Sequence, residues 1–128
     1  MKNILFMMMV LLSFSIFATE SNSNKNQNNK LEKVTFIELG SVNCIPCKMM
    51  QPVMKKIETK YPERVKVIFH DVVAKSGRKY AIKYGIKLIP TQIFLDENGK
   101  EFFRHQGFFA EKEIVDLLDK KLEKSQKK

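Results

Sequence analysis

Residues 34–47 read VTFIELGSVNCIPC, an apolar run that ends a few positions before the pair Cys44 and Cys47. These are the only two cysteines in the 128 residues, and apolar residues at helical spacing follow them as far as Lys60. A strand that leads into a helix here places the thiols at the helix N-terminus, where partial positive charge and unpaired N–H groups favour a thiolate. Two thiols this close can close into a disulfide and reopen. The stretch therefore predicts a redox site.

The two ends of the chain are expected to lie outside the folded domain. Residues 1–18 hold an apolar run from Ile4 to Phe17, and its 14 residues are short for a membrane span of roughly 20. A cleaved signal peptide and an uncleaved anchor both fit this segment, and both predict an exported protein of the periplasm or cell envelope. Residues 19–30 are polar and predict a flexible linker. We expect the domain at 31–122 and a basic tail at 123–128.

Composition and charge restrict the class of protein. The formal net charge is +9, yet the lysines are not interleaved with aromatic residues and no nucleic-acid-binding motif is present. We therefore expect solvated lysines and no nucleic-acid partner, with a weak attraction to anionic lipid as the alternative. Two cysteines are too few for a disulfide scaffold. Nothing in the sequence calls for more than a monomer.

The pattern between linker and tail alternates strands with helices. Strands are predicted at Val34–Leu39, Val65–Phe69, Gln92–Leu95 and Glu101–Arg104, and helices at Lys48–Lys60, Ser76–Tyr84 and around Ile114–Leu122. The turn sequence DENG at 96–99 joins the last two strands as a hairpin. The order β-α-β-α-β-β-α predicts an α/β fold with a mixed central sheet and helices on both of its faces.

Glu38 interrupts an otherwise apolar strand. Alternation places it on the same face as Val34 and Phe36, so we expect its carboxyl group to be buried. Burial of an unpaired carboxylate is unfavourable and raises its pKa. The alternative is that Glu38 reaches the edge of the sheet and pairs with a lysine.

These features together resemble the thioredoxin family over residues 31–122. The resemblance rests on the strand followed by Cys44-Ile45-Pro46-Cys47, on Pro52 in the next helix, on Ile89-Pro90-Thr91 before the hairpin, and on Gly107 before the closing helix. It implies a thioredoxin-like fold and an enzyme, a thiol–disulfide oxidoreductase. Its substrates would be protein disulfides or dithiols. It would need no cofactor beyond its own redox-active disulfide.

The resemblance also implies a role for each residue of the tetrad. Cys44 would be the exposed nucleophile that forms a mixed disulfide with the substrate, and Cys47 would resolve it. Ile45 and Pro46 would set the redox poise of the pair. Glu38 matches the position of a buried acid under the cysteines, where it would act as the general base that takes the proton of Cys47.

Three further residues are expected to form the substrate-binding surface. By the same resemblance, Pro90 would follow a cis peptide bond beside the cysteines, and the main chain at Ile89 would pair with an extended substrate. Asn43 stands where thioredoxins usually have tryptophan, so substrate specificity should differ. An isoleucine before the cis proline favours the reducing branch of the family. We therefore expect a reductant of exported proteins that receives electrons from a membrane thiol-electron transporter.

Two other functions stay open from the sequence. The same fold can work in the opposite direction, as a disulfide-forming oxidase or isomerase. Alternatively, Cys44 and Cys47 could bind Cu(I) in a metallochaperone module, because soft thiolates select this ion. Structural zinc normally has four ligands, and His70 and His105 are isolated in the sequence, so we predict no metal site.

Overall fold

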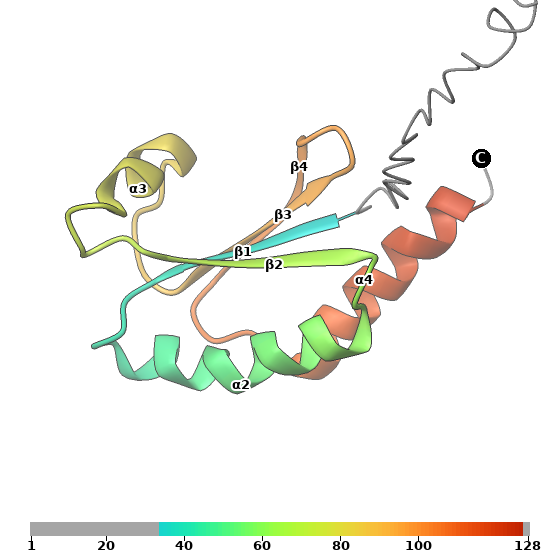
Figure 1. The fold of residues 1–128 in the computed structure, drawn as a ribbon, viewed down its shortest axis with the longest axis horizontal. Coiled ribbons are helices and arrows are strands. Elements are labelled where there is room, and N and C mark those ends of the chain that lie inside the picture. Colours follow the sequence, from blue (N-terminus) through green and yellow to red (C-terminus); the bar gives the residue numbers. More distant parts are fainter. Residues whose placement is uncertain (1–33, 127–128) are drawn as a thin grey trace, which may run out of the picture.

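The structure is a computed structural model that describes residues 34–126. Its elements are β1 (Val34–Gly40), α2 (Ile45–Lys60), β2 (Val65–Asp71), α3 (Arg78–Tyr84), β3 (Thr91–Asp96), β4 (Glu101–Gln106) and α4 (Glu111–Gln126). This order confirms the predicted β-α-β-α-β-β-α succession (Figure 1). The four strands form one sheet in the order β2-β1-β3-β4. β1 is parallel to β2 and antiparallel to β3, so the sheet is mixed as predicted.

The helices cover both faces of this sheet. α2 and α4 lie on one face and α3 on the other (Figure 1). Because neighbouring side chains of a strand point to opposite faces, Phe36 and Glu38 of β1 face α2, whereas Ile37 and Leu39 face α3. We refer to these as the α2/α4 face and the α3 face.

The two faces hold cores of unequal size. Among the described residues, thirteen buried hydrophobic side chains pack on the α2/α4 face, around the stacked rings of Phe36 and Phe94, whose centroids lie 4.7 Å apart. Four buried side chains form the cluster on the α3 face, and α3 itself buries none of its residues fully. Most of the apolar stabilisation therefore comes from the face that carries α2.

The element boundaries differ in places from the prediction. α4 continues to Gln126, past the expected end of the domain at Leu122, because buried Leu122 lies inside the helix and one more turn follows it. α2 begins at Ile45, with Pro46 in its first turn, and runs through Pro52 to Lys60. The predicted signal peptide or anchor and the linker fall within residues 1–33, outside the described part. No helix among the described residues is both long and apolar enough to span a bilayer.

Candidate active site

The two cysteines lie where β1 leads into α2. Cys44 is the N-cap residue of α2, with extended backbone, and its Sγ accepts a hydrogen bond of 3.3 Å from the backbone N–H of Cys47. Cys44 and Cys47 are joined as a disulfide, with their Cα atoms 5.2 Å apart. The first turn of the helix contains no acidic residue. The helix N-terminus and the N–H group of Cys47 would therefore stabilise negative charge on the sulfur of Cys44 once the disulfide is opened.

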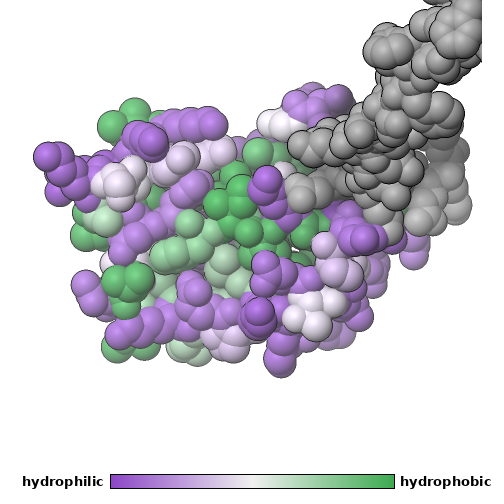
Figure 2. Space-filling model, in the orientation of Figure 1, coloured by the Kyte–Doolittle hydropathy of each residue, from purple (hydrophilic) through white to green (hydrophobic). Residues whose placement is uncertain are grey.

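The cysteines differ in exposure in the predicted direction. Cys47 is 1% exposed, whereas Cys44 is only half-buried. Ile45 between them is 74% exposed, and Pro46 and Asn43 are also on the surface. Figure 2 shows hydrophobic surface, in green, set among hydrophilic residues at the end of the molecule where α2 begins. The sulfur of Cys44 is thus the one that a second protein can reach, and an apolar rim lies beside it.

Gly40 at the end of β1 supports Cys47 from below. A Cβ atom at this position would lie 3.1 Å from the Sγ of Cys47 and 3.3 Å from the ring of Phe69. The backbone of β1 therefore approaches the buried sulfur so closely that a side chain at this position would force Cys47 or Phe69 to shift by a few tenths of an ångström. The sequence pattern did not identify Gly40 as part of the site.

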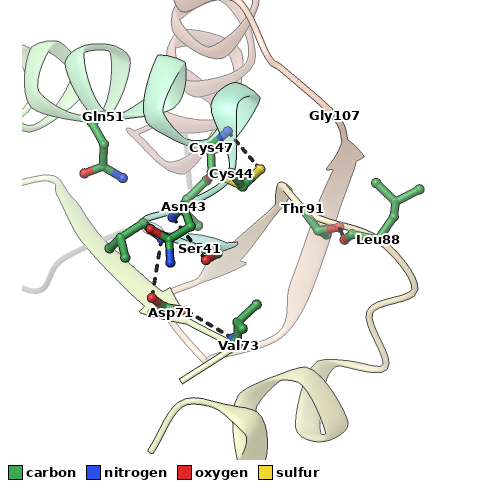
Figure 3. The surroundings of a disulfide bond; sticks show 12 residues. Ser41, Asn43, Cys44, Cys47, Gln51, Asp71, Val73, Leu88, Thr91 and Gly107 are labelled. Atoms are coloured by element: carbon green, nitrogen blue, oxygen red, sulfur yellow. Dashed lines mark hydrogen bonds between the residues drawn. A yellow bond between two sulfur atoms is a disulfide. The ribbon is translucent and has the colours of Figure 1, made fainter. Parts of the chain in front are cut away.

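Asp71 connects the loop before Cys44 to the loop after β2. Its carboxylate accepts hydrogen bonds from the backbone N–H groups of Val42 at 3.4 Å, Val73 at 3.0 Å and Ala74 at 3.2 Å. Figure 3 shows Asp71 with its hydrogen bond to Val73. Partial desolvation raises the pKa of Asp71, but the donors Ala74, Val42 and Val73 outweigh it and hold the pKa below its ordinary value. Asp71 thus fixes the approach to α2, a role that the sequence did not reveal.

The loop before β3 forms the other side of the site. The peptide bond between Ile89 and Pro90 is cis, as the resemblance implied, and Pro90 is buried. The carbonyl of Pro90 accepts a hydrogen bond of 2.8 Å from the N–H of Gly107. Figure 3 draws Leu88 and Gly107 among the residues that surround the disulfide. Within the part of the chain that the structure describes, the backbone of Ile89 makes no hydrogen bond, and this residue is half-buried.

Glu38 is fully buried, as predicted, and lies on the central strand β1 rather than at an edge. Its Oε2 accepts a hydrogen bond of 2.9 Å from the Nε2 of Gln92, which is also fully buried and lies opposite Glu38 on β3. Burial raises the pKa of Glu38 from 4.5 to about 8, although the hydrogen bond from Gln92 lowers it. Glu38 and Gly40 lie two residues apart on β1, so Glu38 shares the face of the strand on which Gly40 meets the buried sulfur of Cys47.

The structure brings the predicted site residues to one end of the sheet, and it places the two histidines in ring stacks. His70 stacks on Tyr80 with ring centroids 3.5 Å apart, and His105 stacks on Phe109 at 4.2 Å. Among residues 34–126, no group of three or more His, Cys, Asp or Glu side chains is placed to hold a metal ion. Gln92 was missed by the sequence analysis, although a polar residue in the apolar strand after Pro90 was a signal that could have identified it.

Comparisons with known proteins agree with this geometry. The thioredoxin family model matches residues 15–120. Thioredoxin of Rickettsia typhi is 27% identical over 100 residues, covering 78% of this chain and 92% of that protein. Thioredoxin of Bacillus subtilis is 29% identical over 91 residues, covering 71% and 85%.

Two solved structures share the fold. A mutant thioredoxin from Halobacterium salinarum superimposes with a TM-score of 0.63 at 22% identity, and thioredoxin from Nicotiana alata with 0.59 at 31% identity. Each pair covers 70% of this chain and 74% of the other. The family match spans most of the chain, and the cysteine pair stands at the start of the helix after the first described strand. The chain therefore belongs to the thioredoxin family and is a thiol–disulfide oxidoreductase.

Proposed function

We propose that this protein is an extracytoplasmic reductant that opens the disulfides of exported proteins through Cys44 and Cys47. The observation that carries the exchange reaction in this proposal is the asymmetry of the pair at the N-terminus of α2, where Cys44 is half-buried and Cys47 is 1% exposed. An accessible sulfur at a helix N-terminus attacks, and a buried neighbour completes the exchange without leaving the protein. The protein works as a monomer and needs no cofactor.

The exchange begins with the thiolate of Cys44. It attacks one sulfur of the substrate disulfide, a bond forms between the two sulfurs, and the other substrate sulfur leaves with the electron pair of the broken bond. Ile89 pairs with the substrate backbone, and the exposed side chains of Ile45, Pro46 and Asn43 contact it. This arrangement holds the substrate disulfide in line with Cys44.

Cys47 then resolves the mixed disulfide. The carboxylate of Glu38 takes the proton of the Cys47 thiol, directly or through one water, and Cys47 attacks the sulfur of Cys44. The substrate leaves as a thiolate, reduced by two electrons, and the protein keeps the Cys44–Cys47 disulfide. A membrane thiol-electron transporter supplies the electrons that reopen it.

The reduction potential of the Cys44–Cys47 pair tests the direction of the reaction. We expect a value near that of thioredoxin, about −270 mV, when the purified protein is equilibrated with dithiothreitol or glutathione. A value near about −120 mV would instead assign the protein to the disulfide-forming oxidases. Failure to form the disulfide at all would overturn both the reductant and the oxidase assignment and favour the Cu(I)-binding alternative.

Trapping experiments test the roles of the two sulfurs. The variant Cys47→Ser should accumulate mixed disulfides with its substrates through Cys44, because the second attack is blocked. The matched variant Cys44→Ser should accumulate none. Equal trapping by both variants would contradict the assignment of Cys44 as nucleophile.

Labelling of whole cells tests the location. A thiol reagent that does not cross membranes should modify Cys44 in intact cells that express the full chain after mild reduction. A cytoplasmic thioredoxin in the same cells serves as the control and should stay unlabelled. Protection of Cys44 until the cells are lysed would contradict export.

A further inference from the structure

Two oxygen atoms beneath the cysteines are buried without a hydrogen-bond partner in the described part of the chain. They are Oε1 of Glu38 and Oε1 of Gln92, which belong to side chains directly opposite each other on β1 and β3. Both side chains are fully buried, so bulk solvent cannot supply the missing hydrogen bonds to these oxygens. Buried polar atoms are normally paired, and two exceptions in one pair of residues require an explanation.

The orientation of the Gln92 carboxamide is fixed by its neighbours. Its Nε2 donates to Oε2 of Glu38 at 2.9 Å and to the carbonyl oxygen of Gly107 at 3.0 Å. A backbone carbonyl can only accept, so the NH₂ group and not the oxygen must face Gly107. Both hydrogens of the NH₂ group are thereby used. One acceptor atom, Oε1, remains unpaired on each side chain. A single proton placed between these two oxygens would give both of them a hydrogen-bond partner.

We propose that in the disulfide form Glu38 and Gln92 make a reciprocal carboxylic acid–carboxamide pair, in which Glu38 Oε1 carries a proton and donates it to Gln92 Oε1. One proton then satisfies both unpaired oxygens. Gln92 is by this argument a positioning residue of the exchange reaction, since it holds the carboxyl group and receives its proton in a hydrogen bond.

This inference rests on the proposed function, because it takes the proton from Cys47. During resolution the S–H bond of Cys47 breaks, and the proton forms an O–H bond with Oε1 of Glu38. The electron pair stays on the sulfur of Cys47 and forms the bond to Cys44, while the substrate sulfur leaves with the pair of the broken bond. When the protein is reduced again, the proton returns to Cys47 and the acid–amide pair opens.

The surroundings of Glu38 favour the protonated acid. Its neighbour on β2 is Phe69 and its neighbour on β3 is Gln92. Cys47 of α2 lies on the same face of β1, against Gly40, and does not ionise while it is part of the disulfide. His105 on β4 lies beyond Gln92, stacked on Phe109 and with its Nε2 3.1 Å from a backbone carbonyl. No lysine or arginine contributes to the raised pKa of Glu38, which follows from burial.

The pair is also connected to the substrate side of the site. Gly107 accepts from Gln92 with its carbonyl and donates its N–H to the carbonyl of Pro90 at 2.8 Å. A continuous set of hydrogen bonds thus runs from Glu38 to the loop that contacts substrate. Gln92 is the only side chain in that set besides Glu38, so its replacement separates the carboxyl group from the loop.

Carbon-13 NMR of the oxidised protein tests the pair directly. The side-chain carboxyl resonance of Glu38 should show the protonated acid at pH 7. The side-chain carbonyl of Gln92 should move with the same midpoint as Glu38 is titrated, since ionisation removes the hydrogen bond that it accepts. In the Glu38→Gln variant the Gln92 resonance should no longer titrate. An ionised Glu38 at pH 7, or a Gln92 carbonyl that does not follow it, would overturn the proposal.

Kinetics test the consequence for exchange. Gln92→Met keeps the length of the side chain without its polar atoms, and it should slow resolution roughly tenfold and shift the pH midpoint of that step. Loss of Glu38 should cost roughly 100-fold or more. Gln106→Met, at an exposed position at the end of β4, is the control and should change neither the rate nor the pH midpoint of resolution. An unchanged midpoint in a folded Gln92→Met variant would contradict a positioning role.

The two proposals can fail separately. If the wild-type protein reduces a disulfide-bonded protein such as insulin but the Gln92 carbonyl does not titrate, the acid–amide pair is wrong and the proposed function stands. If both resonances titrate together in a protein that exchanges no disulfide, the proposed function is wrong and the pair stands. The titrations of the Glu38 and Gln92 resonances use the wild-type chain, so they decide the question even if a variant does not fold.

Discussion

The two faces of the sheet contribute differently to the active site. The α2/α4 face holds the larger core, and the cysteines, Glu38 and Gln92 lie on the same face. The α3 face holds the smaller cluster, and Ile89 from the loop before β3 packs against that cluster. The two sulfurs are therefore anchored to the better-packed part of the molecule, and the loop that we propose contacts the substrate belongs to the more weakly packed part.

The difference in packing matches two different requirements, fixed geometry at the reacting groups and an adaptable surface at the loop. Disulfide exchange needs the attacking sulfur, the resolving sulfur and the base in fixed geometry, which a dense core provides. A loop that accepts different protein segments benefits from low local stability. We therefore expect that substitutions in the apolar core of the α2/α4 face act through stability and those on the α3 face mainly through substrate binding.

Removal of the central aromatic ring of the larger core should give the largest loss of stability. Phe94 is fully buried and contacts four other phenylalanines, so Phe94→Ala should lower the free energy of unfolding by about 3–5 kcal/mol. Tyr80→Ala on the α3 face is the matched variant and should cost only about 1–2 kcal/mol, because Tyr80 is half-buried. Urea denaturation measures both. Equal losses would contradict the unequal contribution of the two faces.

The buried carboxyl group of Glu38 should make stability depend on pH. The unfolded chain releases this proton near pH 4.5 and the folded protein near pH 8, so the folded state binds more protons between these values. The free energy of unfolding therefore falls as the pH rises from 4.5 to 8. Glu38→Gln removes this slope and should be more stable than wild type by about 3 kcal/mol at pH 7, with little difference near pH 4.

Thermal or urea denaturation over this pH range checks the effect of Glu38→Gln. Glu97→Gln provides a control, because Glu97 is exposed in the hairpin turn between β3 and β4. It should alter stability little at any pH. A Glu38→Gln variant that is less stable than wild type at pH 8 would show that the carboxylate is held by favourable contacts, against the present interpretation.

The sequence was sufficient for those features that depend on local pattern. Alternation along 34–39 predicted the burial of Glu38, and the spacing of apolar residues predicted the order of strands and helices. Cys44 and Cys47 were recognisable because they stand between a strand pattern and a helix pattern. The cis bond before Pro90 came from the resemblance and is confirmed.

The features that were missed depend on contacts between distant segments. Gln92 lies 54 positions from Glu38 in the chain, and Asp71 lies 29 positions from Val42. Their partners follow from the register of β1 with its neighbours, which residue spacing within one strand does not determine. Gly40 was missed for a related reason, since only the packing of α2 on β1 shows that a Cβ atom would meet Cys47.

A methyl group at Gly40 should disturb the cysteine end of the α2/α4 face. The added Cβ would press on the Sγ and Cβ of Cys47 and on the ring of Phe69, at 3.1–3.3 Å. Gly40→Ala should therefore cost about 1–3 kcal/mol in unfolding free energy. It should also slow resolution by displacing Cys47 from Glu38. A variant with wild-type stability and exchange rate would show that α2 yields easily, which the dense core argues against.

The smallest effect is expected from the ion pair that joins α2 and α4 at the surface. Nζ of Lys56 lies 2.7 Å from Oε2 of Glu111, but the two side chains are 64% and 40% exposed. Lys56→Met keeps the aliphatic part of the side chain and removes the charge, and it should lower stability by at most about 1 kcal/mol, less at high salt. Urea denaturation at two salt concentrations measures this. A loss as large as that of Phe94→Ala would mean that charge, and not apolar burial, makes the α2/α4 face the stronger one.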